Sequence, residues 1–281
     1  MKFVQSVEPQ PSFYTVPRCE LTSQSLLLDN FFLKMAAKRV HINATEAVPK
    51  VVAKFVADKS KEAVQARGEF YIGVSGGSVA KFLGKELPAM EGIQWAKWHV
   101  YFCDERLVGF DNDDSTYKLY KENWLAGKTS LPEEQMYAIK PELSVEEAAK
   151  DYASKVDKVP KNEKGLPVFD LLVLGMGPDG HTCSLFPGHP LLNETSLTIA
   201  PISDSPKPPP CRVTMTFPVI DSSRCALFAS TGAGKADNVK RVLEVEEAVP
   251  LPAARVNPQG EVHWFLDEAA AGKLTKQYSN M

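Results

Sequence analysis

The most informative segment of the sequence is Val168-Phe169-Asp170-Leu171-Leu172-Val173-Leu174-Gly175-Met176-Gly177-Pro178-Asp179-Gly180-His181-Thr182. Its first seven residues are almost all apolar, which is typical of a strand buried on both faces of a parallel sheet. Its second half is rich in glycine and predicts a loop at the end of that strand. Ligands of open α/β sheets bind at the carboxyl ends of the strands, so this segment also predicts where a site would lie.

Strand and helix patterns alternate on both sides of this segment. We expect further strands at residues 70–74, 98–102, 212–216, 225–230 and 262–266. Helical spacing predicts helices at 45–65, 79–87, 115–125, 235–243 and 267–274, and a capping box from Ser144 to Glu147 opens another. This alternation predicts an open, mostly parallel Rossmann-like α/β sheet with helices on both faces.

Composition narrows the class of protein. The chain has 281 residues, of which 44% are hydrophobic and 24% charged, with a formal net charge of −3. These values favour a globular protein over a disordered one, and the absence of a basic block argues against nucleic-acid binding. No apolar run approaches the ~20 residues that span a bilayer. The five cysteines are odd in number and lack Cys-x-x-Cys spacing, which favours reduced thiols and a cytoplasmic location.

The first 34 residues differ from the rest of the chain. Pro9, Pro11 and Pro17 interrupt them, and they show no sustained helical or strand period. They also lack the apolar run of a signal peptide and the arginine-rich composition of a transit peptide. We therefore expect residues 1–34 to be a leader outside the fold, and residues 35–281 to form a single catalytic α/β domain.

Two polar segments follow the first two predicted strands. Ser75-Gly76-Gly77-Ser78 lies between a strand and a helix, where glycines and backbone amides favour a phosphate; the alternative is a tight turn with a serine cap. Asp104-Glu105-Arg106 follows the strand at 98–102, and Arg106 could clamp a phosphate while Asp104 holds a sugar hydroxyl. The alternative for these three residues is a solvated cluster of ion pairs.

The loop at 175–182 contains a formal Gly-x-Gly-x-x-Gly pattern, the signature of dinucleotide binding. We reject that interpretation because Pro178 removes an amide and Asp179 would place a negative charge beside a pyrophosphate. The loop instead presents Asp179 and His181, and a histidine here suits general acid or base catalysis near neutral pH. The alternative is a histidine with a structural role only.

The segment Thr231-Gly232-Ala233-Gly234-Lys235 follows the strand at 225–230. It fails the P-loop pattern, but Lys235 at the start of a helix is a candidate for contact with an anion; the alternative is an exposed lysine. Pro206-Lys207-Pro208-Pro209-Pro210 is either a polyproline ligand or, as we favour, a stiff loop before the strand at 212–216. No metal-ligand spacing is present in the sequence.

Together these segments resemble the 6-phosphogluconolactonase branch of the glucosamine-6-phosphate isomerase/6-phosphogluconolactonase family. The resemblance lies in residues 73–78, 102–106, 175–187, 200–214 and 234–236, in that order, and extends from about Met35 to the C-terminal helix. It implies an isomerase/lactonase-type fold and hydrolysis of 6-phospho-D-glucono-1,5-lactone, in the oxidative pentose phosphate pathway. It also implies that neither an organic cofactor nor a metal is needed.

The resemblance also assigns roles. The general base of the family falls on His181, and the phosphate and sugar contacts fall on Ser75–Ser78, Arg106 and Lys235. We expect Asp179 and Asp104 to orient His181 or sugar hydroxyls, and Arg212 to be a further candidate for substrate charge. The expected partner is a small phosphorylated sugar lactone, with no nucleic acid and no membrane, and we expect a monomer.

Two alternatives stay open from the sequence. The first is the related amino-sugar phosphate isomerase-deaminase, which carries a glutamate five residues after the histidine; Phe186 holds that position here and cannot take a proton. The second is a sugar-phosphate-binding module without catalysis, which the presence of His181 beside an anion site disfavours. Assays of lactone hydrolysis and of ammonia release would separate these three functions.

Overall fold

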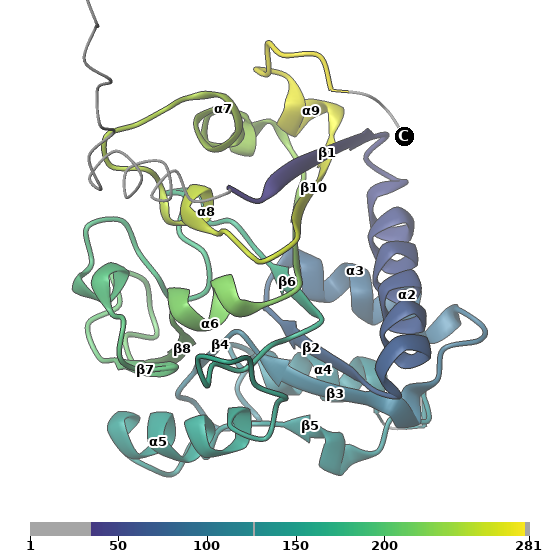
Figure 1. The fold of residues 1–281 in the computed structure, drawn as a ribbon, viewed down its shortest axis with the longest axis vertical. Coiled ribbons are helices and arrows are strands. Elements are labelled where there is room, and N and C mark those ends of the chain that lie inside the picture. Colours follow the sequence, from purple (N-terminus) through teal and green to yellow (C-terminus); the bar gives the residue numbers. More distant parts are fainter. Residues whose placement is uncertain (1–34, 126, 279–281) are drawn as a thin grey trace, which may run out of the picture. The chain divides into compact units, whose positions relative to one another are not determined.

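A parallel sheet organises the chain (Figure 1). The computed structural model describes residues 35–125 and 127–278, so the predicted leader at 1–34 lies outside the described residues. The described residues from Ala36 onward belong to one compact unit. The described strands of the main sheet run in the order β1-β10-β9-β6-β2-β3-β5 and are parallel throughout. They are β1 (Ala37–Asn43), β2 (Phe70–Val74), β3 (Trp98–Phe102), β5 (Met136–Tyr137), β6 (Leu171–Leu174), β9 (Cys225–Ser230) and β10 (Glu261–Asp267).

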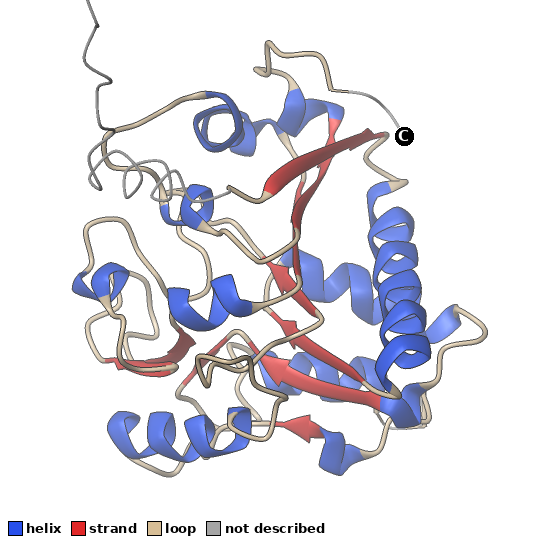
Figure 2. Ribbon diagram, in the orientation of Figure 1, coloured by secondary structure: helices blue, strands red, loops and turns tan. Residues whose placement is uncertain are grey.

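Helices lie on both sides of these strands, as Figure 2 shows, so the predicted open α/β fold is confirmed. The α-helices are α2 (Val48–Arg67), α3 (Ser78–Glu86), α4 (Thr116–Trp124), α5 (Val145–Val156), α6 (Phe217–Ser222), α7 (Ala236–Glu244), α8 (Pro252–Arg255) and α9 (Glu268–Ala271). Short 3₁₀ turns are η1 (Leu87–Ala89), η2 (Trp95–Lys97), η3 (Glu133–Gln135), η4 (Pro190–Asn193) and η5 (Ala233–Lys235). The capping box predicted at Ser144 opens α5. Among the described residues, none of the helices is long and apolar enough to cross a membrane.

The central strand β6 is shorter than predicted. It begins at Leu171 rather than Val168, because at Asp170 the side-chain carboxylate, and not the backbone carbonyl, accepts the hydrogen bond from the neighbouring strand β2. That carboxylate accepts the amide of Tyr71 at 2.9 Å and pairs with Arg67 at 2.7 Å. All four residues of β6 are buried between β2 and β9. The polar residues that follow β6 are therefore held at the middle of the sheet edge.

A second, antiparallel sheet was not expected from the sequence. It has the order β4-β8-β7, with β4 at Asp104–Arg106, β8 at Arg212–Met215 and β7 at Ile199–Ile202. The interpretation of residues 104–106 as a solvated cluster is wrong, since Glu105 is 2% exposed and accepts the amides of Thr116 and Tyr117. The antiparallel pairing of β4 with β8 places Arg106 directly opposite Arg212. Two arginines about a hundred residues apart in the sequence are thus brought together.

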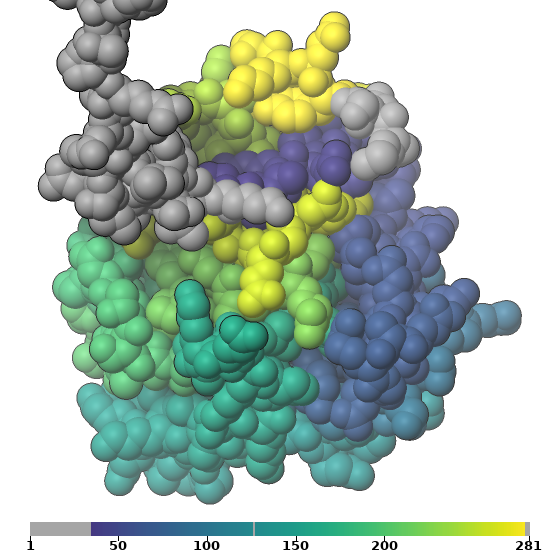
Figure 3. All heavy atoms as spheres, viewed as in Figure 1, coloured from purple at the N-terminus to yellow at the C-terminus, as the bar shows by residue number. Residues whose placement is uncertain are grey.

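The edge strand β1 was also missed by the sequence analysis. Only Val40 of its seven residues is buried, so the strand carries no clear hydrophobic period. It pairs in parallel with β10, more than two hundred residues further along the chain. Figure 3 shows the consequence at the surface, where the purple residues of β1 lie beside the yellow C-terminal segment. The fold therefore includes residues from the first described strand to the end of β10.

Candidate functional site

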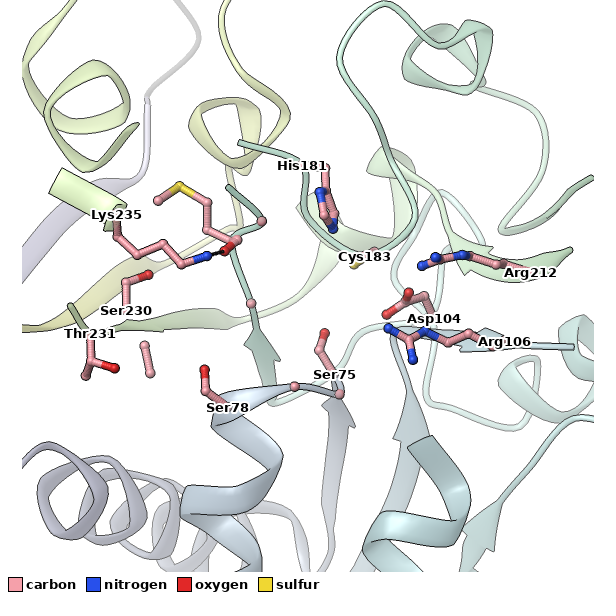
Figure 4. A pocket seen from close by; sticks show the side chains of 16 residues that line it. Ser75, Ser78, Asp104, Arg106, His181, Cys183, Arg212, Ser230, Thr231 and Lys235 are labelled. Carbon is pink, nitrogen blue, oxygen red and sulfur yellow. Dashed lines mark hydrogen bonds between the residues drawn. The ribbon is translucent and has the colours of Figure 1, made fainter. Parts of the chain in front are cut away.

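A cavity of about 220 Å³ opens at the carboxyl ends of β2, β6 and β9. These strands are neighbours in the sheet, so the loops that follow them share one edge, as predicted. All of the predicted site residues except Asp179 line the cavity (Figure 4). The lining residues are Ser75, Gly76, Gly77, Ser78, Asp104, Arg106, Gly175, Met176, Gly177, His181, Cys183, Arg212, Ala229, Ser230, Thr231 and Lys235.

The loop after β6 is folded tightly around His181. A Cβ on Gly177 would lie 2.1 Å from both Nδ1 and Cε1 of His181, closer than any real contact. The Gly177 amide donates to the His181 carbonyl at 2.9 Å, and Gly180 has a φ of +81°, a conformation that favours glycine. Gly177 therefore makes room for the imidazole at the cavity wall, and Gly180 supplies the left-handed turn just before it.

His181 is paired with Asp179 through one ring nitrogen. Nδ1 of His181 lies 2.5 Å from Oδ1 of Asp179. A carboxylate accepts only, so Nδ1 carries the hydrogen and Nε2 is left as the basic nitrogen. Burial lowers the pKa of His181 from its ordinary value, although the negative charge of Asp179 opposes this effect. The imidazole is therefore neutral at neutral pH, which is the form that a general base requires.

Asp179 stays ionised. Burial raises its pKa, but the hydrogen bonds from His181 and from Lys207 outweigh burial and hold the pKa at about 2. Lys207 donates from Nζ to the same carboxylate oxygen at 2.9 Å. The sequence around Lys207 predicts only a stiff loop, and this loop leads directly into β8. Its contact with Asp179 could not be inferred, because Lys207 reaches the carboxylate from a separate loop that does not follow a predicted strand.

Asp104 faces the cavity from β4 and is 8% exposed. Its Oδ2 accepts a hydrogen bond from the Ser184 hydroxyl at 2.8 Å. Figure 4 shows its carboxylate beside the guanidinium groups of Arg106 and Arg212. The orienting contact to His181 thus comes from Asp179, whereas Asp104 presents an acceptor to the space where a ligand would lie.

The β2–α3 loop presents hydrogen-bond donors to the cavity. It ends at the amino terminus of α3, where Gly77 has a φ of +77°. The Tyr120 hydroxyl donates to the Ser75 carbonyl at 3.1 Å and fixes the start of the loop. The Ser75 hydroxyl is buried and has no hydrogen-bond partner among the described residues. Free amides at a helix start and a free hydroxyl are the groups that bind a phosphate.

Three cationic side chains surround this loop. Lys235 donates from Nζ to the Met176 carbonyl at 2.6 Å, and burial lowers its pKa from the ordinary value. Arg106 donates from Nη1 to the Asp114 carbonyl at 2.8 Å. Arg212 bonds the carbonyls of residues 207, 208 and 209. Figure 4 shows Lys235 on one side of the Ser75–Ser78 loop and the two arginines on the other.

Ser230, at the end of β9, also lines the cavity and is not a candidate from the sequence; Thr231, which begins the segment noted above, lines it too. Ser230 is 3% exposed, and its hydroxyl has no hydrogen-bond partner within residues 35–125 and 127–278. The available signal was its place at the carboxyl end of a predicted buried strand. In the sequence, the glycines and the lysine that follow are the candidates for contact with an anion.

Phe186 occupies the position where an isomerase-deaminase carries a glutamate. Its side chain is 1% exposed, and its ring centroid lies 4.6 Å from that of His181. The imidazole therefore has an apolar neighbour on this side rather than a second carboxylate. Among the described residues no group of three or more histidine, cysteine, aspartate or glutamate side chains is arranged to hold a metal ion.

Comparisons with known proteins identify the family of this chain. The sequence model described as glucosamine-6-phosphate isomerases/6-phosphogluconolactonase matches residues 43–264. The chain is 54% identical over 215 residues to 6-phosphogluconolactonase of Homo sapiens, covering 75% of this chain and 83% of that protein. It is 44% identical over 251 residues to 6-phosphogluconolactonase 3, chloroplastic, of Arabidopsis thaliana, covering 86% and 77%.

Solved structures show the same fold. A 6-phosphogluconolactonase from Shewanella baltica superposes with a TM-score of 0.71 at 28% identity, covering 84% of this chain and 99% of that one. A monomeric glucosamine-6-phosphate deaminase superposes with a TM-score of 0.69 at 20% identity, covering 84% and 100%, which shows the fold alone. From the match over residues 43–264 and the identity to these relatives, the chain belongs to the glucosamine-6-phosphate isomerase/6-phosphogluconolactonase family.

Proposed function

We propose that this protein hydrolyses 6-phospho-D-glucono-1,5-lactone to 6-phospho-D-gluconate, the lactonase step of the oxidative pentose phosphate pathway. The observation that carries the proposal is the pairing of His181 with Asp179 at 2.5 Å on the wall of a cavity lined with phosphate-binding groups. The names of relatives at 50–54% identity support it. A lactone is an activated ester, so a base for water and stabilisation of an oxyanion suffice for its hydrolysis.

His181 acts as the general base. Its Nδ1–H donates to Asp179, so Nε2 takes a proton from a water molecule whose oxygen attacks C1 of the lactone. A C1–O bond forms and the carbonyl becomes an oxyanion. When the oxyanion collapses, the bond between C1 and the ring oxygen breaks, and the proton held by His181 passes to that ring oxygen. A positioned base contributes on the order of 10²–10⁴ to the rate.

The phosphate of the substrate lies at the β2–α3 loop. The amides of Gly76–Ser78 at the start of α3 and the Ser75 hydroxyl supply donors, and Arg106 and Lys235 reach this loop from its two sides. Asp104 accepts a hydrogen bond from a sugar hydroxyl, since it is the carboxylate that lines the cavity. Arg212 adds positive charge near the substrate and holds the loop that carries Lys207. No step in this proposal uses a metal or an organic cofactor.

The proposal is tested by following lactone hydrolysis and ammonia release side by side. The lactone is assayed at slightly acidic pH, where spontaneous ring opening is slow, and glucosamine 6-phosphate is the second substrate. We expect rapid lactone hydrolysis and no ammonia, because Phe186 supplies no proton-transfer group beside His181. Ammonia release would establish the isomerase-deaminase function instead. Binding of 6-phosphogluconate without turnover of either substrate would establish a binding module.

We further propose that the protein works in the cytoplasm as a monomer without bound nucleic acid. The cytoplasmic location is supported by the free cysteines at 103, 183, 211 and 225. The plant relatives carry chloroplastic names, so the compartment needs its own test, which is microscopy of a fluorescent fusion of the full chain. Light scattering coupled to gel filtration tests the oligomeric state, and a monomer should give a single mass near 30.9 kDa.

A further inference from the structure

Lys207 is a charged group close to His181 that does not line the cavity. Its Nζ lies 2.9 Å from Oδ1 of Asp179 and 3.3 Å from Nδ1 of His181. Its side chain is 33% exposed, so the ammonium group is partly open to solvent. Asp179, its direct partner, is likewise absent from the cavity lining, whereas His181 is part of it. Lys207 is therefore placed to act on His181 and not on a ligand.

The loop that carries Lys207 is fixed by two side chains. Arg212 donates from Nη2 to the carbonyls of Lys207 and Pro208, at 2.9 and 3.1 Å. The Ser205 hydroxyl donates to the Lys207 carbonyl at 2.9 Å and accepts the Lys207 amide at 3.3 Å. The backbone of Lys207 is thus held on both sides. This anchoring favours a defined position for the ammonium group over a mobile surface lysine.

We propose that Lys207 is a positioning residue that holds the Asp179 carboxylate on the Nδ1–H of His181 and keeps His181 in its neutral, basic form. This inference rests on the proposed function of His181 as a general base. It gives the proline-rich segment a role in the reaction. It also links Arg212 to the base, through the loop that Arg212 anchors.

The chemistry of the three groups explains the role. An ammonium can only donate, so Lys207 binds the carboxylate and offers no acceptor to Nδ1. Asp179 then accepts two hydrogen bonds at Oδ1, which fixes its orientation and the tautomer of His181. The positive charge of Lys207 disfavours the imidazolium and lowers the pKa of His181, after the larger effect of burial.

The other groups that face His181 have different effects. Asp179 and Asp104 carry negative charge and raise the pKa of His181. Phe186 packs against the ring and carries no charge. Arg212 and Lys235 line the same cavity. Lys207 is the cation in direct contact with the pair, so removing it takes away a positive charge that opposes the two aspartates, while the larger effect of burial remains.

The experiment measures the titration of His181 by NMR in the full-length protein, with a His181→Gln variant to assign the ring resonance. In Lys207→Met we expect the titration midpoint to move to higher pH, whereas Lys207→Arg stays near the wild type. A matched control is Lys164→Met, since Lys164 is exposed and takes no part in the contacts among Asp179, His181 and Lys207. Because no substrate is present, this measurement is independent of whether the proposed reaction is correct.

The kinetic arm follows lactone hydrolysis at two pH values. For Lys207→Met we expect a loss of kcat that is about three- to tenfold larger at about pH 6 than at about pH 8, with KM little changed. Thermal denaturation confirms that each variant is folded. An unchanged midpoint of His181, or an equal loss of kcat at both pH values, would overturn the proposal. So would a rise in KM alone, which would make Lys207 a substrate-binding residue.

Discussion

Replacing Gly177 by alanine is expected to disable the site while leaving the fold in place. The added Cβ would lie 2.1 Å from two atoms of the His181 ring and 2.7 Å from Oδ1 of Asp179. The imidazole must turn away, because both nearest atoms belong to the ring and cannot be avoided by a small side-chain shift. Gly177 is not among the glycines with positive φ, so alanine meets no backbone penalty and the effect is local.

The magnitude follows from the role of His181. If the ring can no longer direct Nε2 at a water molecule, the general-base contribution of about 10²–10⁴ in kcat is lost, which is about 3–5 kcal/mol of the activation barrier. Crowding of this kind costs about 1–3 kcal/mol of folding stability, which a domain of this size tolerates. We therefore expect a large loss of kcat with a modest fall in Tm.

The assay combines lactone hydrolysis at slightly acidic pH with thermal denaturation. Gly234→Ala is the matched control, because a Cβ on Gly234 meets nothing within 4 Å, its φ is not positive, and it does not line the cavity. We expect that variant to keep both its Tm and its turnover. The reasoning is refuted if Gly177→Ala turns over the lactone within about threefold of the wild type, a difference that leaves the barrier almost unchanged.

Three further outcomes are expected. Ser230→Ala should raise KM about three- to tenfold with little change in kcat. The buried Ser230 hydroxyl has no hydrogen-bond partner in the described part of the chain and is free to bind the substrate, so an unchanged KM would show that Ser230 is not part of the site. Burial lowers the pKa of His181 below its ordinary value of 6.5, so the rate should be highest above that pKa and should fall as the pH drops through it. A pH–rate profile whose acid-side midpoint lies above pH 6.5 would contradict this. Dialysis against a chelator should leave the rate unchanged, and loss restored by a divalent metal would show that the reaction needs one.

The elements of the main sheet that could be predicted are those with strong apolar runs. The sequence placed β2, β3 and β9 at their observed bounds, since each lies between neighbours and is buried along most of its length. It missed β1 because an edge strand with one buried residue has little hydrophobic pattern. It missed β4 because three charged residues form a strand only through their pairing with β8, which long-range contacts determine.

The same distinction separates the site residues. His181, Ser75–Ser78 and Lys235 follow strands that the sequence reveals, so their place at one edge could be inferred. Lys207 reaches Asp179 from a separate loop. The hydroxyl of Ser230 is buried and has no hydrogen-bond partner within the described residues, 35–125 and 127–278. Such contacts depend on how the loops fold over the sheet edge, which local sequence does not encode.

The central claim is that His181 is the base of a lactonase. It is tested most directly by the rate of lactone hydrolysis by His181→Ala, corrected for spontaneous ring opening, together with the affinity for 6-phosphogluconate from calorimetry. The account predicts a fall in kcat on the order of 10²–10⁴, with product affinity and Tm close to those of the wild type. Turnover retained within a few-fold of the wild type by a folded variant would contradict it.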